Sequence, residues 1–340
     1  MKKSLLALAA LTAFAGVASA QSSVTLFGVV DVSIRTVDND NGSRTSMATG
    51  GNASNRLGFR GVEDLGGGLR AGFWIEGDMT PDNGTAGGQT WLRRSTVSLM
   101  GGFGELRLGR DYTPSFWNHA VFDPFGNVGV GSQLNLIGGA SVYSTLVRTN
   151  NTVGYFLPAM GGLYGQVQVG LDEGEAAGSD IGYVGGRIGY AAGPVNVAVA
   201  YGETKPPHPA SGPTSKAGNV GASFNMGFMT LMGQYHEYKA GSNKLNNFLV
   251  GGTVPLGKGT LKLSGAQTEI KFASGAKPKS TQFAVGYVYD LSKRTALYAT
   301  GSVVDNDTGL GFVAGGGGKA RAPVTGFSST GYEFGVRHSF

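Results

Sequence analysis

Segments in which apolar and polar residues alternate recur along almost the whole chain, and this pattern limits the possible folds more than any other feature. In 69–76, LRAGFWIE, apolar residues occupy every odd position, while Arg70 and Glu76 stand at even positions. Because successive side chains of a strand point to opposite faces, this pattern predicts a β-strand with one apolar and one polar face. The same alternation appears in 24–35, 56–60, 282–291 and 332–340. The chain is therefore predicted to be all-β.

The composition supports strands and excludes several other classes. Of 340 residues, 60 are Gly and none is Cys. Each Gly in a helix interior costs about 1 kcal/mol, so long helices are not expected. The lack of Cys excludes disulfide scaffolds and thiolate chemistry. The four histidines are at least 28 residues apart, so we expect no bound metal and no cofactor.

The first twenty residues have the form of an export signal. Lys2 and Lys3 precede an apolar stretch, and Ala18-Ser19-Ala20 matches a signal peptidase site. We therefore predict a signal peptide at 1–20 and a mature domain at 21–340. Without the two leader lysines, the formal net charge falls from +5 to +3, too mild for a nucleic-acid partner.

Short and long connections alternate along the mature chain. Seven short turns are predicted at 63–68, 101–104, 158–162, 192–194, 225–228, 256–258 and 291–294. Eight long connections are predicted at 37–53, 79–89, 111–147, 172–180, 203–215, 240–244, 271–280 and 305–327. Seven turns and two chain ends on one side, with eight loops on the other, give sixteen strands. This asymmetry is typical of a transmembrane antiparallel β-barrel, in which closure leaves no unpaired strand edge in lipid.

The polar faces of these strands favour a barrel over the alternative, a large soluble β-sandwich. Asp31, Arg56, Arg60 and Glu76 all point away from the apolar faces. If a sandwich enclosed the face that carries these four residues, that face would lie in a dry core, where unpaired charges are costly. In a barrel it is a water-filled lumen, so these four residues are predicted lumen charges.

Several segments resemble the general porins of Gram-negative bacteria, in their betaproteobacterial branch. They are SVTLFGVVD at 23–31, RLGFRGVEDLG at 56–66, GFGELRLGR at 102–110, YVYDLSKRT at 287–295 and GVRHSF at 335–340. The resemblance spans nearly the whole mature chain. It implies an outer-membrane homotrimer in contact with lipid and lipopolysaccharide, and a terminal Phe340 that resembles the signal read by the outer-membrane assembly machinery.

The resemblance also implies a pore constriction. In the family the third external loop, here Asp111 to Val147, folds into the barrel, and Asp123 stands at the turn of its tip. The family's arginine cluster maps onto Arg56, Arg93 and Arg148. One departure is that alternation through 97 and 99 would make Arg94 the inward residue instead of Arg93, unless a bulge or a subunit contact intervenes.

Two nucleotide-binding patterns are incomplete in this chain, and a hydrolase signature is missing. The segment 252–258 fits a phosphate-binding loop, but Gly259 stands where Ser or Thr is required. The segment 309–314 matches a loose dinucleotide pattern without the strand and helix that it needs. No G-x-S-x-G motif is present, so no enzymatic function is predicted.

The predicted function is passive diffusion of ions and small hydrophilic solutes through a water-filled barrel, with a preference for anions. The excess of arginine over acidic residues near the expected constriction is the basis for that preference. The main alternative is a substrate-specific outer-membrane channel. A barrel that serves as an adhesin is a further alternative, and it would bind without conducting.

Overall fold

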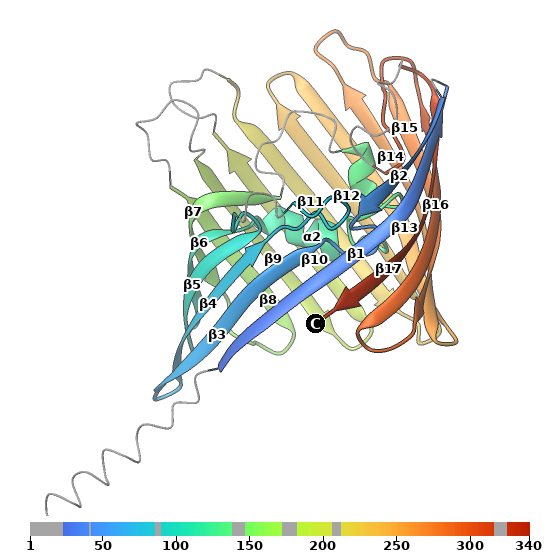
Figure 1. Ribbon diagram of the computed structural model, residues 1–340. Helices are drawn as coiled ribbons and strands as arrows, with labels where there is room; N and C mark the ends of the chain where they lie inside the picture. Colours follow the sequence, from blue (N-terminus) through green and yellow to red (C-terminus); the bar gives the residue numbers. More distant parts are fainter. Residues whose placement is uncertain are drawn as a thin grey trace, which may run out of the picture.

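The computed structural model describes residues 23–40, 42–85, 90–137, 147–171, 182–205, 212–315 and 325–340. These form a single antiparallel sheet of seventeen strands that closes on itself (Figure 1). The predicted signal peptide at 1–20 lies outside the described residues. In the described part of the chain, no helix has the length and apolar character needed to cross a membrane.

The strands follow one another around the sheet in chain order. They are β1 (Ser23–Asn39), β2 (Gly42–Thr49), β3 (Arg56–Gly66), β4 (Leu69–Gly77), β5 (Arg94–Gly101), β6 (Gly104–Tyr112), β7 (Arg148–Phe156), β8 (Leu163–Gly170), β9 (Tyr183–Ala192), β10 (Val195–Thr204), β11 (Ser215–Asn225), β12 (Thr230–Ala240), β13 (Asn243–Leu256), β14 (Gly259–Lys271), β15 (Lys279–Asp290), β16 (Thr295–Asn306) and β17 (Ser328–Ser339). The described helices, α2 (Pro114–Val121) and the short 3₁₀ helix η2 (Gln133–Leu136), lie between β6 and β7.

Two of the strands share one position in the barrel. β3 pairs with the first part of β1, from Ser23 to Val29, and β2 pairs with its second part, from Val32 to Asn39. The segment 50–55 separates β2 from β3. Seventeen strands therefore occupy sixteen positions, and the predicted sixteen-stranded barrel is confirmed. The predicted long loop at 37–53 was wrong in most of its extent, because β1 and β2 extend through it as a hairpin.

The barrel closes where the two ends of the chain meet. β1 pairs with β17 from Val29 opposite Ser339 to Asn39 opposite Ser329. Just beyond, Gly28 and Phe340 exchange two backbone hydrogen bonds of 3.0 and 3.1 Å. A Cβ atom on residue 28 would lie 2.3 Å from Cζ of Phe340, so glycine at this position makes room for the terminal ring.

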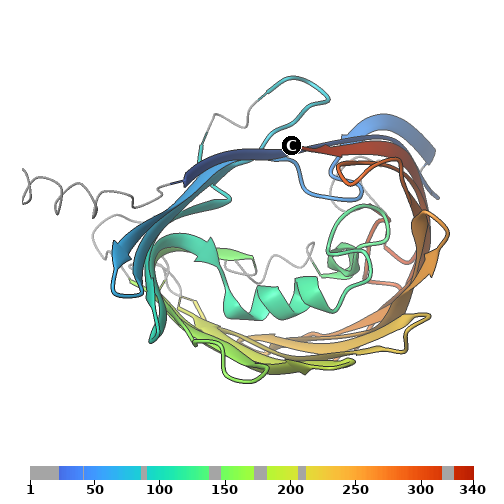
Figure 2. The ribbon, with the colours of Figure 1, turned by 90° about the horizontal axis from the view of Figure 1, so that it is seen from below.

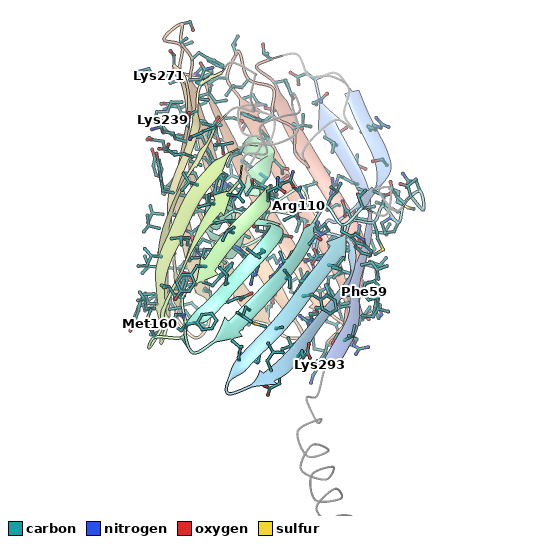
Figure 3. The ribbon with its side chains drawn as sticks, turned by 90° about the vertical axis from the view of Figure 1, so that its left-hand side faces the viewer. Phe59, Arg110, Met160, Lys239, Lys271 and Lys293 are labelled. Atoms are coloured by element: carbon teal, nitrogen blue, oxygen red, sulfur yellow. The ribbon has the colours of Figure 1, made fainter. Side chains whose placement is uncertain are left out.

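The two faces of the sheet differ as the alternation predicts. The outward face exposes large apolar side chains, among them Phe59, which is labelled in Figure 3, and Val97. The inward face carries buried polar side chains such as Gln168, Asn219 and Gln282. The apolar outer surface suits contact with lipid tails, while the closed sheet satisfies the strand backbone.

The connections differ between the two ends of the barrel. The seven predicted short turns all lie at one end, where Figure 3 labels Met160 and Lys293, and Lys239 and Lys271 lie at the other. One predicted long connection, 240–244, is instead a tight turn, since β12 ends at Ala240 and β13 begins at Asn243.

Candidate pore lining and constriction

The connection between β6 and β7 begins with a capped helix. Thr113 precedes α2 and its hydroxyl accepts a hydrogen bond of 3.3 Å from the backbone N–H of Phe116, while Pro114 occupies the first turn. Both residues are favoured at the start of a helix, because the cap satisfies an otherwise free N–H and proline has none to satisfy. Figure 2 shows α2 within the ring of strands, beside the wall formed by β8 to β11.

Amide side chains attach α2 to this wall. Asn118 donates to the side-chain oxygen of Asn219 at 2.9 Å, and Asn219 donates to the backbone carbonyl of Ser115 at 3.0 Å. Arg187, from β9, donates to the side-chain oxygen of Asn118. Each amide therefore both donates and accepts, so buried polar groups on the helix and on the wall satisfy one another.

Further along, the connection is held by β11, β16 and β17. Ser302 donates to the backbone carbonyl of Val130 at 2.6 Å, and Val130 donates its N–H to Glu333 at 3.0 Å. Phe122 packs so closely on Gly221 that a Cβ there would lie 2.1 Å from its ring. These contacts join the segment 113–137 to widely separated parts of the inner wall.

Asp123 serves the internal structure of this segment. Its carboxylate accepts hydrogen bonds from the backbone N–H groups of Phe125, Asn127 and Gln133, at 2.9, 3.1 and 3.2 Å. Asp123 is only 4% exposed, and burial raises the pKa of its carboxyl, against the opposing effect of these N–H donors. The sequence places Asp123 at the loop tip, but its charge is turned into the segment and away from the lumen.

A pair of histidines lies between α2 and the wall. The rings of His119 and His236, from β12, are stacked with their centroids 3.8 Å apart, and both residues are fully buried. The amide oxygen Oε1 of Gln234 accepts a 2.8 Å hydrogen bond from Nε2 of His236. Burial lowers the pKa of His119 to about 4, so this ring is neutral near pH 7.

The three predicted arginines come together on the wall next to the start of this connection. Nε of Arg93 lies 2.6 Å from a carboxylate oxygen of Glu76, and Nη1 of Arg56 lies 3.6 Å from the same oxygen. Arg93 and Arg148 each donate to the hydroxyl of Tyr112, at 3.1 and 2.9 Å. Arg56 is on β3, Arg148 is on β7, and Arg93 directly precedes β5. Tyr112, which joins two of these side chains, was not predicted from the sequence.

A family model described as Gram-negative porin matches residues 7–309. The chain belongs to the Gram-negative porin family. Outer membrane porin protein 32 of Delftia acidovorans is 39% identical over 356 residues, covering 100% of both chains. An outer membrane porin protein of Bordetella pertussis is 30% identical over 372 residues, covering 90% of this chain and 95% of that protein. A solved structure, an anion-selective porin from Comamonas acidovorans, is 36% identical with a TM-score of 0.82, covering 94% of this chain and 100% of that one.

Both candidate arginines of this porin lie on the inner side of the wall. Arg94 begins β5 opposite Glu76, and its Nε lies 3.4 Å from Asp111. Arg93 precedes the strand, so the alternation does not apply to it, and its backbone N–H donates to the carbonyl of Glu76 at 3.1 Å. Both side chains therefore face the inner wall, because Arg93 lies before the first residue of β5, where strict alternation no longer sets its direction.

The other predicted lumen charges of the porin differ in burial: two are buried and one is exposed. Asp31 is 0% exposed, and its carboxylate accepts from the backbone N–H groups of Asn52 and Ala53 at 2.9 and 2.6 Å, which holds the segment between β2 and β3. Glu76 is 2% exposed and belongs to the arginine cluster. Arg60 is exposed and lies over the rings of Phe27 and Trp74.

The arginine cluster carries a net positive charge. Arg56, Arg93 and Arg148 supply three positive charges, which leaves +2 against the buried Glu76 alone and +1 when the exposed Asp78 is also counted. Asp78 is the next carboxylate, 4.0 Å from Arg93 and 57% exposed.

Among the residues that the structure describes, no three His, Asp or Glu side chains come together as a metal site would require.

Proposed function

We propose that this porin is a general diffusion channel of the outer membrane of a Gram-negative bacterium and that it prefers anions. The observation that carries the proposal is the group of Arg56, Arg93 and Arg148, whose positive charge exceeds that of the carboxylates paired with it. Charged side chains at the narrowest part of a pore select among ions by attraction and repulsion. The similarity to relatives named as porins, one of them an anion-selective porin, supports the same reading.

We infer that the connection between β6 and β7 narrows the channel. Its helix α2 lies within the ring of strands and is attached to the wall by Asn118 and Asn219 (Figure 2). The residues 138–146 of this connection lie outside the described part of the chain. Tyr112, at its start, contacts both Arg93 and Arg148, so the constriction and the arginine cluster would be at the same depth.

The alternative is a channel specific for one solute. A specific channel would show a current that saturates, or is blocked, as the concentration of its solute rises. A general porin conducts in proportion to salt concentration. The same bilayer recordings therefore distinguish the two, and we propose no enzymatic role for the barrel.

Reversal potentials under a potassium chloride gradient test the proposal. The parent channel should favour chloride, and Arg56→Ala and Arg148→Ala should each move the reversal potential towards cation preference, with a larger shift for the double variant. Lys293→Ala, at a short turn, is the control and should leave the potential unchanged. A parent that favours potassium would refute the anion preference.

The partners proposed for the channel follow from the family. A homotrimer would close in three equal conductance steps and would migrate as an oligomer in unheated gels. Phe340, whose backbone pairs with Gly28 at the seam, is proposed as the signal read by the assembly machinery. Lipopolysaccharide would surround the end of the barrel that carries the long connections.

A further inference from the structure

A second group of arginines lies on the inner wall nearer the short turns. It lines a recess of about 370 Å³ formed by β3, β4, β5 and β6 together with the start of β1. Its lining includes Arg60, Trp74, Arg94, Ser98, Met100 and Arg107. Arg60 follows Arg56 by four positions on the same face of β3, a displacement of about 13 Å along the strand. The recess thus adjoins the cluster proposed as the constriction, to which Trp74 is connected through Glu76, while Arg60 itself is displaced along the wall.

Two of the three arginines in this recess are already neutralised. Arg107 lies 2.8 Å from Glu105 and 2.6 Å from Asp111, and its guanidinium is over the ring of Phe156. Arg94 lies 3.4 Å from Asp111. Three positive charges face two negative ones, so one positive charge remains. Within the described ranges, Arg60 makes no ion pair, and the excess charge of the recess is therefore on Arg60.

Aromatic rings hold the guanidinium of Arg60 in place. Its Cζ lies 5.3 Å from the ring centre of Phe27 and 5.1 Å from that of Trp74, and these two rings are themselves 4.9 Å apart. Trp74 is fixed by a 3.0 Å hydrogen bond from Nε1 to Glu76. Stacking on aromatic rings orients a guanidinium while leaving its N–H edges free to bind. Arg60 is exposed, so these edges are accessible from the lumen.

The chemistry of the recess selects for a carboxylate with an apolar body. The planar fork of a guanidinium matches the two oxygens of a carboxylate, whereas a spherical chloride gains no such geometric advantage. Next to the guanidinium, Met100 packs over Gly72, where a Cβ would lie 2.8 Å from its Cε, and presents apolar surface. The hydroxyl of Ser98 donates to Glu105 at 2.6 Å, and Arg60 is the one arginine among the described residues of the recess that no carboxylate pairs.

We propose that this recess, the Arg60 site, binds small organic carboxylates such as benzoate as they pass through the lumen. The carboxylate would accept hydrogen bonds from Arg60, and its apolar part would rest against Met100. The site rests on the proposed function, because it needs an open lumen through which anions pass. It adds a substrate class, organic monocarboxylates, to a channel whose constriction selects only by charge and size.

Tryptophan fluorescence measures binding directly. Trp74 becomes the sole tryptophan in the Trp91→Phe, Trp117→Phe background, since the chain has three tryptophans. Titration of the folded protein in detergent with sodium benzoate should change the Trp74 signal and saturate. Sodium chloride at equal ionic strength is the control for salt effects, and it should produce a smaller change.

Variants of Arg60 decide whether that signal comes from the proposed contact. Arg60→Gln should weaken apparent benzoate affinity about fivefold, as expected for loss of an accessible ion pair. Arg60→Lys, which keeps the charge and loses the fork, should also weaken it. Lys293→Gln removes one positive charge at the same end of the barrel and should leave the affinity unchanged. Parent-like affinity in Arg60→Gln or in Arg60→Lys would overturn the proposal.

Reversal potentials separate this inference from the proposed function. If the parent favours potassium in potassium chloride, the anion preference fails, while an Arg60-dependent benzoate signal would still support the site. If the parent favours chloride and Arg60→Gln binds benzoate like the parent, the site is refuted and the anion preference stands.

Discussion

Replacing Glu76 by Gln should strengthen the anion preference, the opposite of what removing an arginine should do. The side chain keeps its size, and the amide can still accept the hydrogen bond from Nε1 of Trp74. The change removes the negative charge that lies 2.6 Å from Arg93 and 3.6 Å from Arg56. The net charge of the cluster would rise from +2 to +3, counting Arg148 and leaving out the exposed Asp78.

The magnitude follows from the position of Glu76 behind the guanidinium groups. At about 8 Å from a passing ion, a unit charge contributes about 0.5 kcal/mol in a medium as polar as water. The contribution has opposite signs for chloride and potassium, so the difference between the two ions changes by about 1 kcal/mol. The chloride-to-potassium permeability ratio should therefore rise about fivefold.

Bilayer reversal potentials of Glu76→Gln and Glu76→Asp provide the assay. Glu76→Asp keeps the charge and should retain the parent ratio to within about twofold. Breaking a buried ion pair also costs stability, so heat resistance of the folded form on gels should be measured alongside. A Glu76→Gln channel that is folded but has an unchanged or lower ratio would refute the assignment of this cluster to the ion path.

Three further predictions concern assembly, export and pH. Gly28→Ala should lower the yield of folded barrel, because a Cβ there would displace the ring of Phe340, whereas Gly102→Ala, with open space around it, should not; equal yields would refute this. The mass of the protein extracted from outer membranes should correspond to a first residue of Gln21, and a retained leader would contradict the predicted export signal. Because the pKa of His119 is about 4 in the folded state and near 6.5 when exposed, docking of α2 should be fully stable above pH 6.5 and weaken as pH falls towards 4. Conductance fluctuations should grow over that range in the parent and not in His119→Phe, and identical pH profiles would exclude this histidine as the cause.

The strand pattern was predictable because alternation and turn composition act locally. The seven short turns were located correctly, and six of the seven contain glycine. The first long connection, 37–53, was not located correctly. The length of β1 depends on two partner strands, since β3 pairs with its first part and β2 with its second part. Pairing between distant segments leaves no local signal of this kind.

The partners of the predicted lumen charges, and so their accessibility, could not be predicted from the sequence. Alternation predicts that Asp31 and Glu76 are lumen charges. In the structure the carboxylate of Asp31 accepts from two backbone N–H groups, and that of Glu76 pairs with two arginines. The sequence cannot show which backbone donors a carboxylate will meet. Nor could it show that Arg93 and Arg94 both face inward, since this depends on the residue at which β5 begins.

The seam between β1 and β17 has a consequence for the order of events during folding. Gly28 lies in β1 and Phe340 directly follows β17, so the hydrogen bonds between them cannot form until both of these distant strands have been synthesised and delivered. Contacts between residues this far apart in sequence form slowly, because a very long loop must close first. Until then two strand edges remain open, and each is a template for pairing with another chain. The rate at which this seam closes, in competition with aggregation, would therefore set how much of the exported protein reaches its final state.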